Sequence, residues 1–335
     1  MSPPRPRHPG LVVIALLLCA LALATGLPAD AQSTTGIGAP VEQAPDSTCF
    51  GAAARDPLHP CRDPKLRLRV IPSPDDALLE PNGHCTPVGP TKVLLPCAFG
   101  TPAAEETDTI ALVGDSHASH WRAAVEVMAD ARGWRGISLT HSGCPFSKAV
   151  AALEGANRSE CRAWNRAVLR WFAAHPEVHT VFVSEHSGGK VDVPKGSTMR
   201  ATQVNGYLGV WAALPANVTR IFVIRDTPRN VSATSACVSR AMAHRVPAGP
   251  KCAVRRRTAL RPDPAVAAAR QAPPDRVKIV DLTSFFCSSR LCLPVIGGAL
   301  VHKDIDHLTQ TFAATLGPYL LRQVDAIGVP GPPAR

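Results

Sequence analysis

The chain has 335 residues, of which 45% are hydrophobic, 36 are lysine or arginine and 26 are aspartate or glutamate. This content supports a substantial core within one large domain or two small ones, which excludes a chain without a packed core. The 33 prolines and an aromatic content of only 5% predict long irregular segments beside that core.

The first feature along the chain is a predicted secretory signal peptide over residues 1–31. Arg5 and Arg7 make its start basic, Leu11–Ala24 is an apolar run, and Ala29-Asp30-Ala31 is a small-x-small cleavage site. The run is short for a membrane span, although an uncleaved membrane anchor remains the alternative. We therefore expect a secreted or extracytoplasmic protein of the cell envelope, with no nucleic-acid partner and a membrane contact only if the segment is uncleaved.

Ten cysteines follow this segment in five close sequential pairs. An even number of cysteines in an exported chain predicts disulfides, although the sequence alone does not prove which cysteines are joined. Zinc binding is the competing interpretation, but no spacing is Cys-x-x-Cys and an oxidising compartment disfavours thiolate ligands. The expected pairs are Cys49/Cys61, Cys85/Cys97, Cys144/Cys161, Cys237/Cys252 and Cys287/Cys292.

The segments before the main domain differ in composition. Residues 32–48 are polar and rich in Gly, Ser, Thr and Pro, which is typical of a flexible leader. Residues 49–107 hold four cysteines and many prolines with little periodicity, so we expect an irregular, disulfide-stapled segment packed on the main domain. The main domain is expected over residues 108–328, and residues 329–335 form a tail.

The main domain alternates strand-like and helix-like patterns. Continuous apolar strands that alternate with helices predict a mainly parallel five-stranded sheet covered on both faces, which is a doubly wound α/β sandwich. The expected strands are Thr109–Val113, Gly136–Thr140, Thr180–Ser184, Arg220–Ile224 and Val277–Leu282. The expected helices are Ala118–Ala131, Arg162–Ala174, Ala201–Leu214, Pro264–Gln271 and Gln310–Ile327.

One basic insertion, Cys237–Arg261, interrupts this alternation and carries much of the formal net charge of +10. It follows Arg225-Asp226-Thr227-Pro228, at a carboxyl strand end where such folds bind ligands, so we expect it at the rim of the active site. A solvated basic loop and a patch that faces an anionic envelope polymer are both compatible with its composition.

A Gly-Asp-Ser-His turn after the first of these strands carries the candidate nucleophile, Ser116. A strand, a tight turn and a helix expose one side chain at the carboxyl edge of a sheet. A serine hydroxyl needs a base to remove its proton, and His307 is the best candidate. Asp304 precedes His307 by three residues, within reach of the imidazole, and Asp306 is the rival for this orienting role. Helix capping is the structural alternative for the two aspartates.

These patterns resemble the SGNH (GDSL-like) hydrolase superfamily, and in particular the SGNH domain at the C-terminus of membrane-bound family 3 acyltransferases, which O-acylate cell-envelope glycans. The resemblance covers roughly residues 45–325. It implies a flavodoxin-like, three-layer α/β/α sandwich with the triad Ser116, Asp304 and His307. The matching stretches are Leu112-Val113-Gly114-Asp115-Ser116-His117-Ala118 with Trp121, Ser142-Gly143-Cys144-Pro145, Asp304-x-x-His307-Leu308, and Cys85 to Cys97-Ala98-Phe99-Gly100.

The oxyanion hole is expected to include the backbone N–H of Ser116. The resemblance implies Gly143 as a second donor, and a plain turn glycine is the alternative for that position. The superfamily places an asparagine donor after the third strand, but residues 183–189 read Val-Ser-Glu-His-Ser-Gly-Gly. His186 or a backbone amide is the expected substitute for this third donor.

Three histidines near these motifs are candidates for contact with the substrate or a metal. His117 and His186 are expected to bind substrate. His117 and His120 lie one turn apart, but two histidines without a carboxylate cluster are weak evidence, so we expect no metal and no cofactor. Trp121 and Trp164 are expected in the core rather than against a sugar ring.

The predicted function is an exported serine acyl-ester enzyme, an O-acetyltransferase or O-acetylesterase, that acts on cell-envelope carbohydrate through an acyl-Ser116 intermediate. Its expected partners are an acylated glycan or acyl donor and a separate membrane acyltransferase. A non-catalytic glycan-binding module that retains the fold is the alternative from another class. A peptidase is compatible with the triad, but nothing in the sequence indicates a peptide groove.

Overall fold

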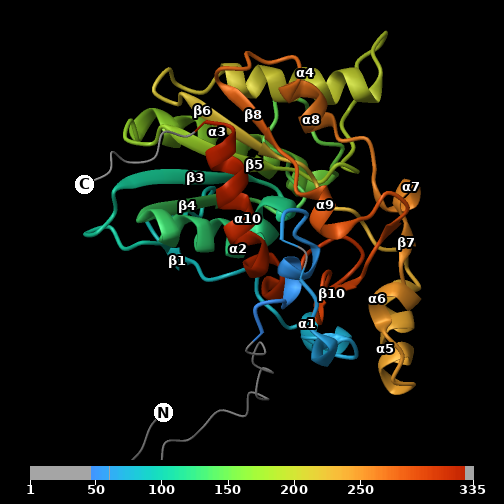
Figure 1. The fold of residues 1–335 in the computed structure, drawn as a ribbon. Helices are drawn as coiled ribbons and strands as arrows, with labels where there is room; N and C mark the ends of the chain where they lie inside the picture. The colour runs from blue at the N-terminus through green and yellow to red at the C-terminus, as the bar shows by residue number, and fades with distance from the viewer. Residues whose placement is uncertain (1–46, 60, 329–335) are drawn as a thin grey trace, which may run out of the picture. The chain divides into compact units, whose positions relative to one another are not determined.

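The computed structural model describes residues 47–59 and 61–328, which belong to one compact unit (Figure 1). The predicted signal peptide, almost all of the leader and the tail at 329–335 lie outside the described residues. Within the described part of the chain, no helix is long and apolar enough to cross a membrane.

A seven-stranded sheet with the strand order β1-β2-β4-β3-β5-β6-β8 forms the centre. Its five parallel strands follow the flavodoxin-like order, as expected. They are β3 (Asp108–Gly114), β4 (Trp134–Thr140), β5 (Thr180–Ser184), β6 (Arg220–Ile224) and β8 (Val277–Val280).

The sheet has two more strands than predicted. The strands β1 (Thr86–Pro87) and β2 (Cys97–Gly100) extend it antiparallel beyond β4. They come from residues 49–107, which were expected to be irregular. The two strands were not predicted because they are too short to show an alternation of apolar and polar residues in a proline-rich sequence. The disulfide Cys85–Cys97 links the segment before β1 to the first residue of β2.

Helices cover both faces of the sheet, which places the core in two layers. In β3, Ile110 and Leu112 pack under one helical layer while Ala111 and Val113 pack under the other, because successive side chains of a strand point to opposite faces. The first layer contains α2 (Ser116–Arg132) and α10 (Gln310–Ala326), and the second contains α3 (Gly155–Ala174), α4 (Met199–Ala212) and α8 (Pro264–Ala269). Trp121 and Trp164 are each 1% exposed in these cores, as expected.

Shorter elements surround the sandwich. The strand β7 (Val254–Arg255) pairs with β9 (Leu291–Cys292), and β10 (Val295–Ile296) pairs with β11 (Ala299–Leu300). The remaining short helices are η1 (Gly51–Arg55), η2 (Pro64–Leu66), α1 (Pro74–Ala77), α5 (Thr234–Ala243), α6 (Ala248–Lys251), α7 (Arg256–Ala259) and α9 (Thr283–Phe286).

All five expected disulfides are present, with paired Cα atoms 3.9–5.8 Å apart. Each closes a short loop of the chain, which limits the conformations of the unfolded state and so stabilises the fold. The last two hold the basic insertion and the β9 hairpin beside it. The five are Cys49–Cys61, Cys85–Cys97, Cys144–Cys161, Cys237–Cys252 and Cys287–Cys292.

The position of Cys161 corrects one predicted helix. The predicted helix begins at Arg162, which places Cys161 in the loop before it, but α3 begins at Gly155 and contains Cys161. The prediction was wrong because residues 155–160 are all exposed and show no apolar periodicity, so Cys161 is the first buried residue of the helix. The Cys144–Cys161 disulfide is therefore an interior bond that joins the loop after β4 to a buried face of α3, and both of its cysteines belong to the second core layer.

Candidate active site

The turn between β3 and α2 is fixed by Gly114 and Asp115. Gly114 has φ +146°, and an added Cβ would lie 2.1 Å from the carbonyl oxygen of Ser184, so only glycine fits this approach. The Asp115 carboxylate accepts the backbone N–H of His117 at 2.8 Å and that of His186 at 2.9 Å. Asp115 therefore caps α2 and ties this turn to the loop after β5. As a result, Ser116 is the first residue of α2 and is half-buried at the carboxyl edge of the sheet.

The side chains of Ser116, His307 and Asp304 form one hydrogen-bonded chain, as the sequence predicts. Ser116 Oγ lies 2.9 Å from His307 Nε2, and Asp304 Oδ2 lies 2.8 Å from His307 Nδ1. The rival carboxylate, on Asp306, is 3.7 Å from the same nitrogen. Asp304 is therefore the residue that holds the His307 ring in place.

The backbone around His307 is held independently of this chain. Asp304 Oδ1 accepts the backbone N–H groups of Asp306 and His307, at 3.0 and 2.7 Å. The backbone N–H of Asn230, in the loop after β6, donates to the carbonyl of Ile305 at 2.7 Å. Thr309 then caps α10, so neither Asp304 nor Asp306 has the capping role that was the structural alternative for the two aspartates. These contacts fix the loop before α10 against the carboxyl edge of the sheet.

Asp304 stays ionised at neutral pH. Its partial burial would raise the pKa of the carboxyl, but the hydrogen bonds from the His307 ring and from two backbone N–H groups lower the pKa further. The net pKa lies well below that of an ordinary aspartate. An ionised carboxylate at Nδ1 keeps the proton of neutral His307 on that nitrogen, so Nε2 is free to accept the proton of Ser116.

A buried ion pair lies beside the candidate nucleophile and was not predicted. Nδ1 of His117 is 2.6 Å from Oδ1 of Asp226, and the two side chains are 1% and 4% exposed. Burial would lower the pKa of His117, but the charge and hydrogen bond of Asp226 raise it to about 9. His117 is therefore an imidazolium at neutral pH. Its position in the interior does not fit the predicted contact with substrate, and we assign it a positioning role instead.

Asp226 also organises the loop after β5. Its Oδ2 accepts the backbone N–H of Ser187 at 2.8 Å, and its own N–H donates to Oδ2 of Asp263 at 2.9 Å. Burial would raise the pKa of Asp226, yet His117 lowers it by more. The anion at Asp226 therefore joins the ends of β5 and β6 to the start of α8.

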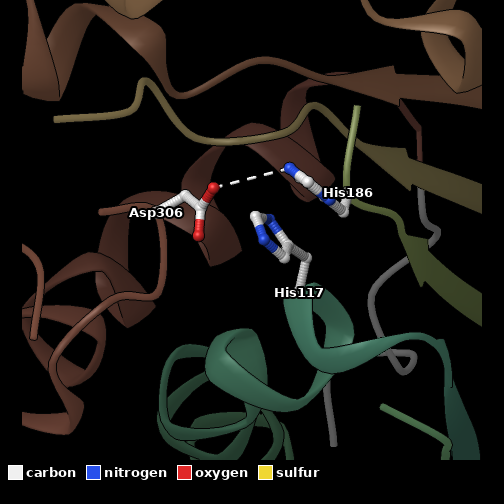
Figure 2. Close-up of side chains that lie close together, drawn as sticks. All are labelled: His117, His186 and Asp306. Atoms are coloured by element: carbon white, nitrogen blue, oxygen red, sulfur yellow. Dashed lines mark ion pairs between the residues drawn. The ribbon is translucent and has the colours of Figure 1, made fainter. Parts of the chain in front are cut away.

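The His117 and His186 rings and Asp306 face one another, as Figure 2 shows. The two rings stack with their centroids 4.6 Å apart, and His186 Nε2 is 3.5 Å from Oδ2 of Asp306. One ligand atom from each residue lies within 4.8 Å of the others, so these residues could hold a metal ion, as could Asp304, Asp306 and His307. Metal binding by His117, His186 and Asp306 would displace a proton from His117 and break the contact between His186 and Asp306.

Further titratable groups are buried around the site. Burial lowers the pKa of His120 well below its ordinary value and that of His302 to about 4, so both rings are neutral. Burial and the neighbouring Asp115 raise the pKa of Glu185, whose Oε1 accepts the backbone N–H of Phe146 at 2.9 Å. Glu185 thus links the loop after β5 to the loop after β4, which contains Gly143.

The expected oxyanion donors differ in whether their N–H groups already have a hydrogen-bond partner. Ser116 and Gly143 follow neighbouring parallel strands, so their backbone N–H groups lie at the same edge of the sheet. Neither N–H donates to another described residue. The proposed third donor is less favourable, because His186 Nε2 pairs with Asp306 and the N–H groups of His186 and Ser187 bind Asp115 and Asp226.

The sequence reasoning missed Asp226, Glu185 and His302. Asp226 and Glu185 come within two residues after an apolar strand, which is the position where parallel sheets gather functional side chains. That signal was available, but it does not say which partner each acid meets. His302 lies in no recognisable pattern.

Comparisons with known proteins agree with this fold. The sequence model of a family described as the SGNH domain (fused to AT3 domains) matches residues 84–322. The chain is also similar to a solved structure titled "Structure of Salmonella ser. Paratyphi A lipopolysaccharide acetyltransferase periplasmic domain". The TM-score is 0.50 at 13% identity, over 66% of this chain and 84% of that chain, which shows a shared fold. No curated protein matches the chain.

Proposed function

We propose, on the premise that this chain belongs to the SGNH domain family, that it is an exported serine acyl-ester enzyme. It transfers or removes O-acetyl groups on cell-envelope carbohydrate through an acyl-Ser116 intermediate. The observation that carries this proposal is the hydrogen-bonded chain from Ser116 Oγ through the His307 ring to Asp304. Membership of the family supports esterase or acyltransferase chemistry for this protein.

In the proposed mechanism, Ser116 Oγ attacks the carbonyl carbon of an acyl ester while its proton passes to His307 Nε2. The ionised Asp304 stabilises the imidazolium that forms. The negative charge that develops on the carbonyl oxygen is stabilised by the N–H groups of Ser116 and Gly143. Collapse of the tetrahedral intermediate gives the leaving alcohol the proton from His307 and leaves the acyl group on Ser116.

The second half of the reaction decides the enzyme class. Water attack on acyl-Ser116 makes the protein an esterase, and attack by a sugar hydroxyl makes it a transferase. His307 removes the proton of the attacking group in both cases, so the triad geometry is the same. In the transferase mode, we propose that a separate membrane acyltransferase supplies the acyl donor. Five disulfides support an oxidising, extracytoplasmic location for either mode.

A glycan-binding module without catalysis is the second candidate. The observation that favours it is the loop after β5, which lacks the expected asparagine and whose first two N–H groups after Glu185 already bind Asp115 and Asp226. A site with only two oxyanion donors stabilises the intermediate less, which is compatible with binding alone.

Covalent labelling separates the two candidates. The mature protein is treated with a serine-reactive phosphonate, and the adduct is mapped by mass spectrometry. We expect labelling at Ser116 in the wild type and none in Ser116→Ala, which removes one oxygen and changes stability by less than about 1 kcal/mol. The exposed Ser142, at the same edge of the sheet, provides the matched control Ser142→Ala, which should label normally. A folded wild type that is not labelled leaves the binding module as the function.

A further inference from the structure

The part of the chain between Asp226 and Asp263 has an extreme charge composition. It contains seven arginines and one lysine, and it has no aspartate or glutamate. This stretch, residues 227–262, includes the basic insertion and accounts for a charge of +8 in a chain whose formal net charge is +10. A stretch this unbalanced repels itself unless its charges are spread out or meet an anion.

The fold gathers these charges instead of spreading them. The β7–β9 ladder pairs Arg255 with Leu291, and the backbone N–H of Arg256 donates to the carbonyl of Arg290 at 2.8 Å. An open surface cavity of about 680 Å³ results, lined by Leu260, Ser289, Leu291 and a cluster that we call the arginine surface, which consists of Arg255, Arg256, Arg257 and Arg290. Figure 1 shows α5, α6, β7 and α7 in orange at one margin of the described part.

The arginine surface has no internal counter-charge. None of its four guanidinium groups forms an ion pair with a described residue, and the one hydrogen bond found is from Arg256 Nη1 to the carbonyl of Ser288 at 3.1 Å. Disulfides hold both of its walls, because Cys237–Cys252 closes the chain before β7 and Cys287–Cys292 closes the β9 turn. A rigid scaffold therefore keeps four cations together without an acid to neutralise them.

The same segment reaches the candidate active site. Ala259 and Arg261, on either side of Leu260, line a small cavity that His186 and Asp306 also line. A Cβ added to Gly188 would lie 2.1 Å from Nη1 of Arg261, so this guanidinium packs against the loop that follows β5. The arginine surface is therefore connected, through Leu260 and its two neighbours in the chain, to the loop that carries His186.

We propose that the arginine surface binds an anionic polysaccharide, whose chain then extends past Arg261 to Ser116; this inference rests on the proposed function. Guanidinium groups bind carboxylate and phosphate oxygens through paired N–H donors, so several arginines suit a polymer with repeated anionic groups. Leu260 and Leu291 supply apolar surface between the arginines against which the C–H faces of sugar rings can pack. The site thus selects a negatively charged glycan substrate over a neutral one.

A matched pair of triple variants tests this proposal. Arg255→Gln/Arg257→Gln/Arg290→Gln removes three charges from the arginine surface and leaves Arg256, which has a backbone contact, in place. Arg162→Gln/Arg166→Gln/Arg170→Gln removes three exposed charges along α3. No residue of α3 lines the cavity. Both variants have the same net charge, so a difference between them reports position and not total charge.

Binding is measured by calorimetry with the full mature protein. The probes are polygalacturonate for carboxylates, phosphomannan for phosphates, dextran as a neutral glycan, and phosphatidylglycerol vesicles for an anionic lipid surface. We expect an anionic glycan to bind and dextran not to bind, with affinity that falls between about 50 and about 200 mM salt because the contacts are screened. The arginine-surface variant should bind about tenfold more weakly with a smaller salt dependence, and the α3 variant should stay within about twofold of the wild type.

The remaining outcomes would overturn the proposal. They are equal weakening in both variants, equal binding of dextran, or binding of the vesicles with no binding of either anionic glycan. Hydrolysis of a small acetyl ester is measured in parallel and should be the same in both variants. If Ser116 is not labelled but the glycan result holds, the proposed catalysis has failed while the binding inference stands.

Discussion

Asp226 and His117 lie 109 residues apart in the sequence, yet their side chains form a buried ion pair of 2.6 Å beside the candidate nucleophile. His117 follows Ser116 directly, and its ring centroid is 5.0 Å from that of His307. The pair therefore places a fixed imidazolium next to Ser116 and His307, and it connects the ends of β3 and β6.

Removal of the anion should destabilise the fold strongly. Asp226→Asn leaves the His117 imidazolium buried without its partner, which typically costs about 3–5 kcal/mol of unfolding free energy. The double variant His117→Gln/Asp226→Asn should lose less unfolding free energy than the sum of the losses in the two single variants, because neither buried charge remains. Urea unfolding at neutral pH measures the stability of the wild type, the two single variants and the double variant. If the losses of the two single variants simply add in the double variant, His117 and Asp226 do not interact directly.

The pH dependence of the same pair has a defined sign. The pKa of His117 is about 9 in the folded state and about 6.5 in an unfolded chain, so folding favours the protonated ring. Its contribution is fully present below about pH 6.5 and is lost as the pH rises through about 9. The stability gap between wild type and Asp226→Asn should therefore shrink from about pH 7 to about pH 10.

The two aspartates beside His307 should differ in their effect on catalysis. Asp304→Asn retains an acceptor for the backbone N–H groups but favours the wrong tautomer of His307, so turnover of a small acetyl ester should fall by about 10³–10⁴. Asp306→Asn should cost about tenfold or less, because its carboxylate is 3.7 Å from Nδ1 and pairs with His186. Steady-state kinetics rank the two variants, and the reverse order would exclude Asp304 as the orienting residue.

His302 should make the protein less stable in mild acid. Its folded-state pKa is about 4 and its unfolded value about 6.5, so the unfolded chain takes up a proton first. Stability should fall by about 3 kcal/mol between pH 6.5 and pH 4 from this group and level off below that range.

His302→Leu should reduce this loss of stability between pH 6.5 and pH 4. The variant removes a ring whose two nitrogens have no hydrogen-bond partner among the described residues. His244→Gln is the control, since His244 is exposed and water surrounds its ring in both states. Urea midpoints across this pH range measure the effect. If His302→Leu and wild type lose stability in parallel, another group is responsible.

The disulfides should account for every cysteine of the mature chain. Thiol titration of the denatured, unreduced protein should detect no free thiol, and several reactive thiols would contradict the pairing. Each short loop contributes about 2–3 kcal/mol by chain entropy, so reduction should lower the melting temperature. Activity measured well below that temperature should persist, because none of the ten cysteines belongs to the triad.

The outline of the fold and the proximity of Ser116, His307 and Asp304 could be predicted from local patterns. Apolar strands followed by helices fix the order of elements, and the rules for parallel sheets then give the flavodoxin-like arrangement. The turn at Ser116 was recognisable because a glycine and a capping aspartate between a strand and a helix have local causes.

Three helix starts were placed too late in the sequence, and one of them, predicted at Ala201, is late by two residues because α4 begins at Met199. The first predicted helix began at Ala118, but α2 begins at Ser116 because Asp115 is its cap. The second began after Cys161 instead of at Gly155, because the exposed first turns of α3 carry no apolar pattern. Packing of the later turns against the sheet is what makes that stretch helical, and the sequence of the first turns does not contain this information.

The sequence by itself determined which residues are candidates for catalysis and which cysteines are close neighbours, since both depend on the local order of residues. Only the tertiary structure decided that Asp226 meets His117, that His117 lies in the interior, and that Arg290 joins Arg255 and Arg257. Such contacts depend on how the ends of separate strands and loops converge. The free energy of a buried charge depends on that convergence and not on the residues next to it in the chain.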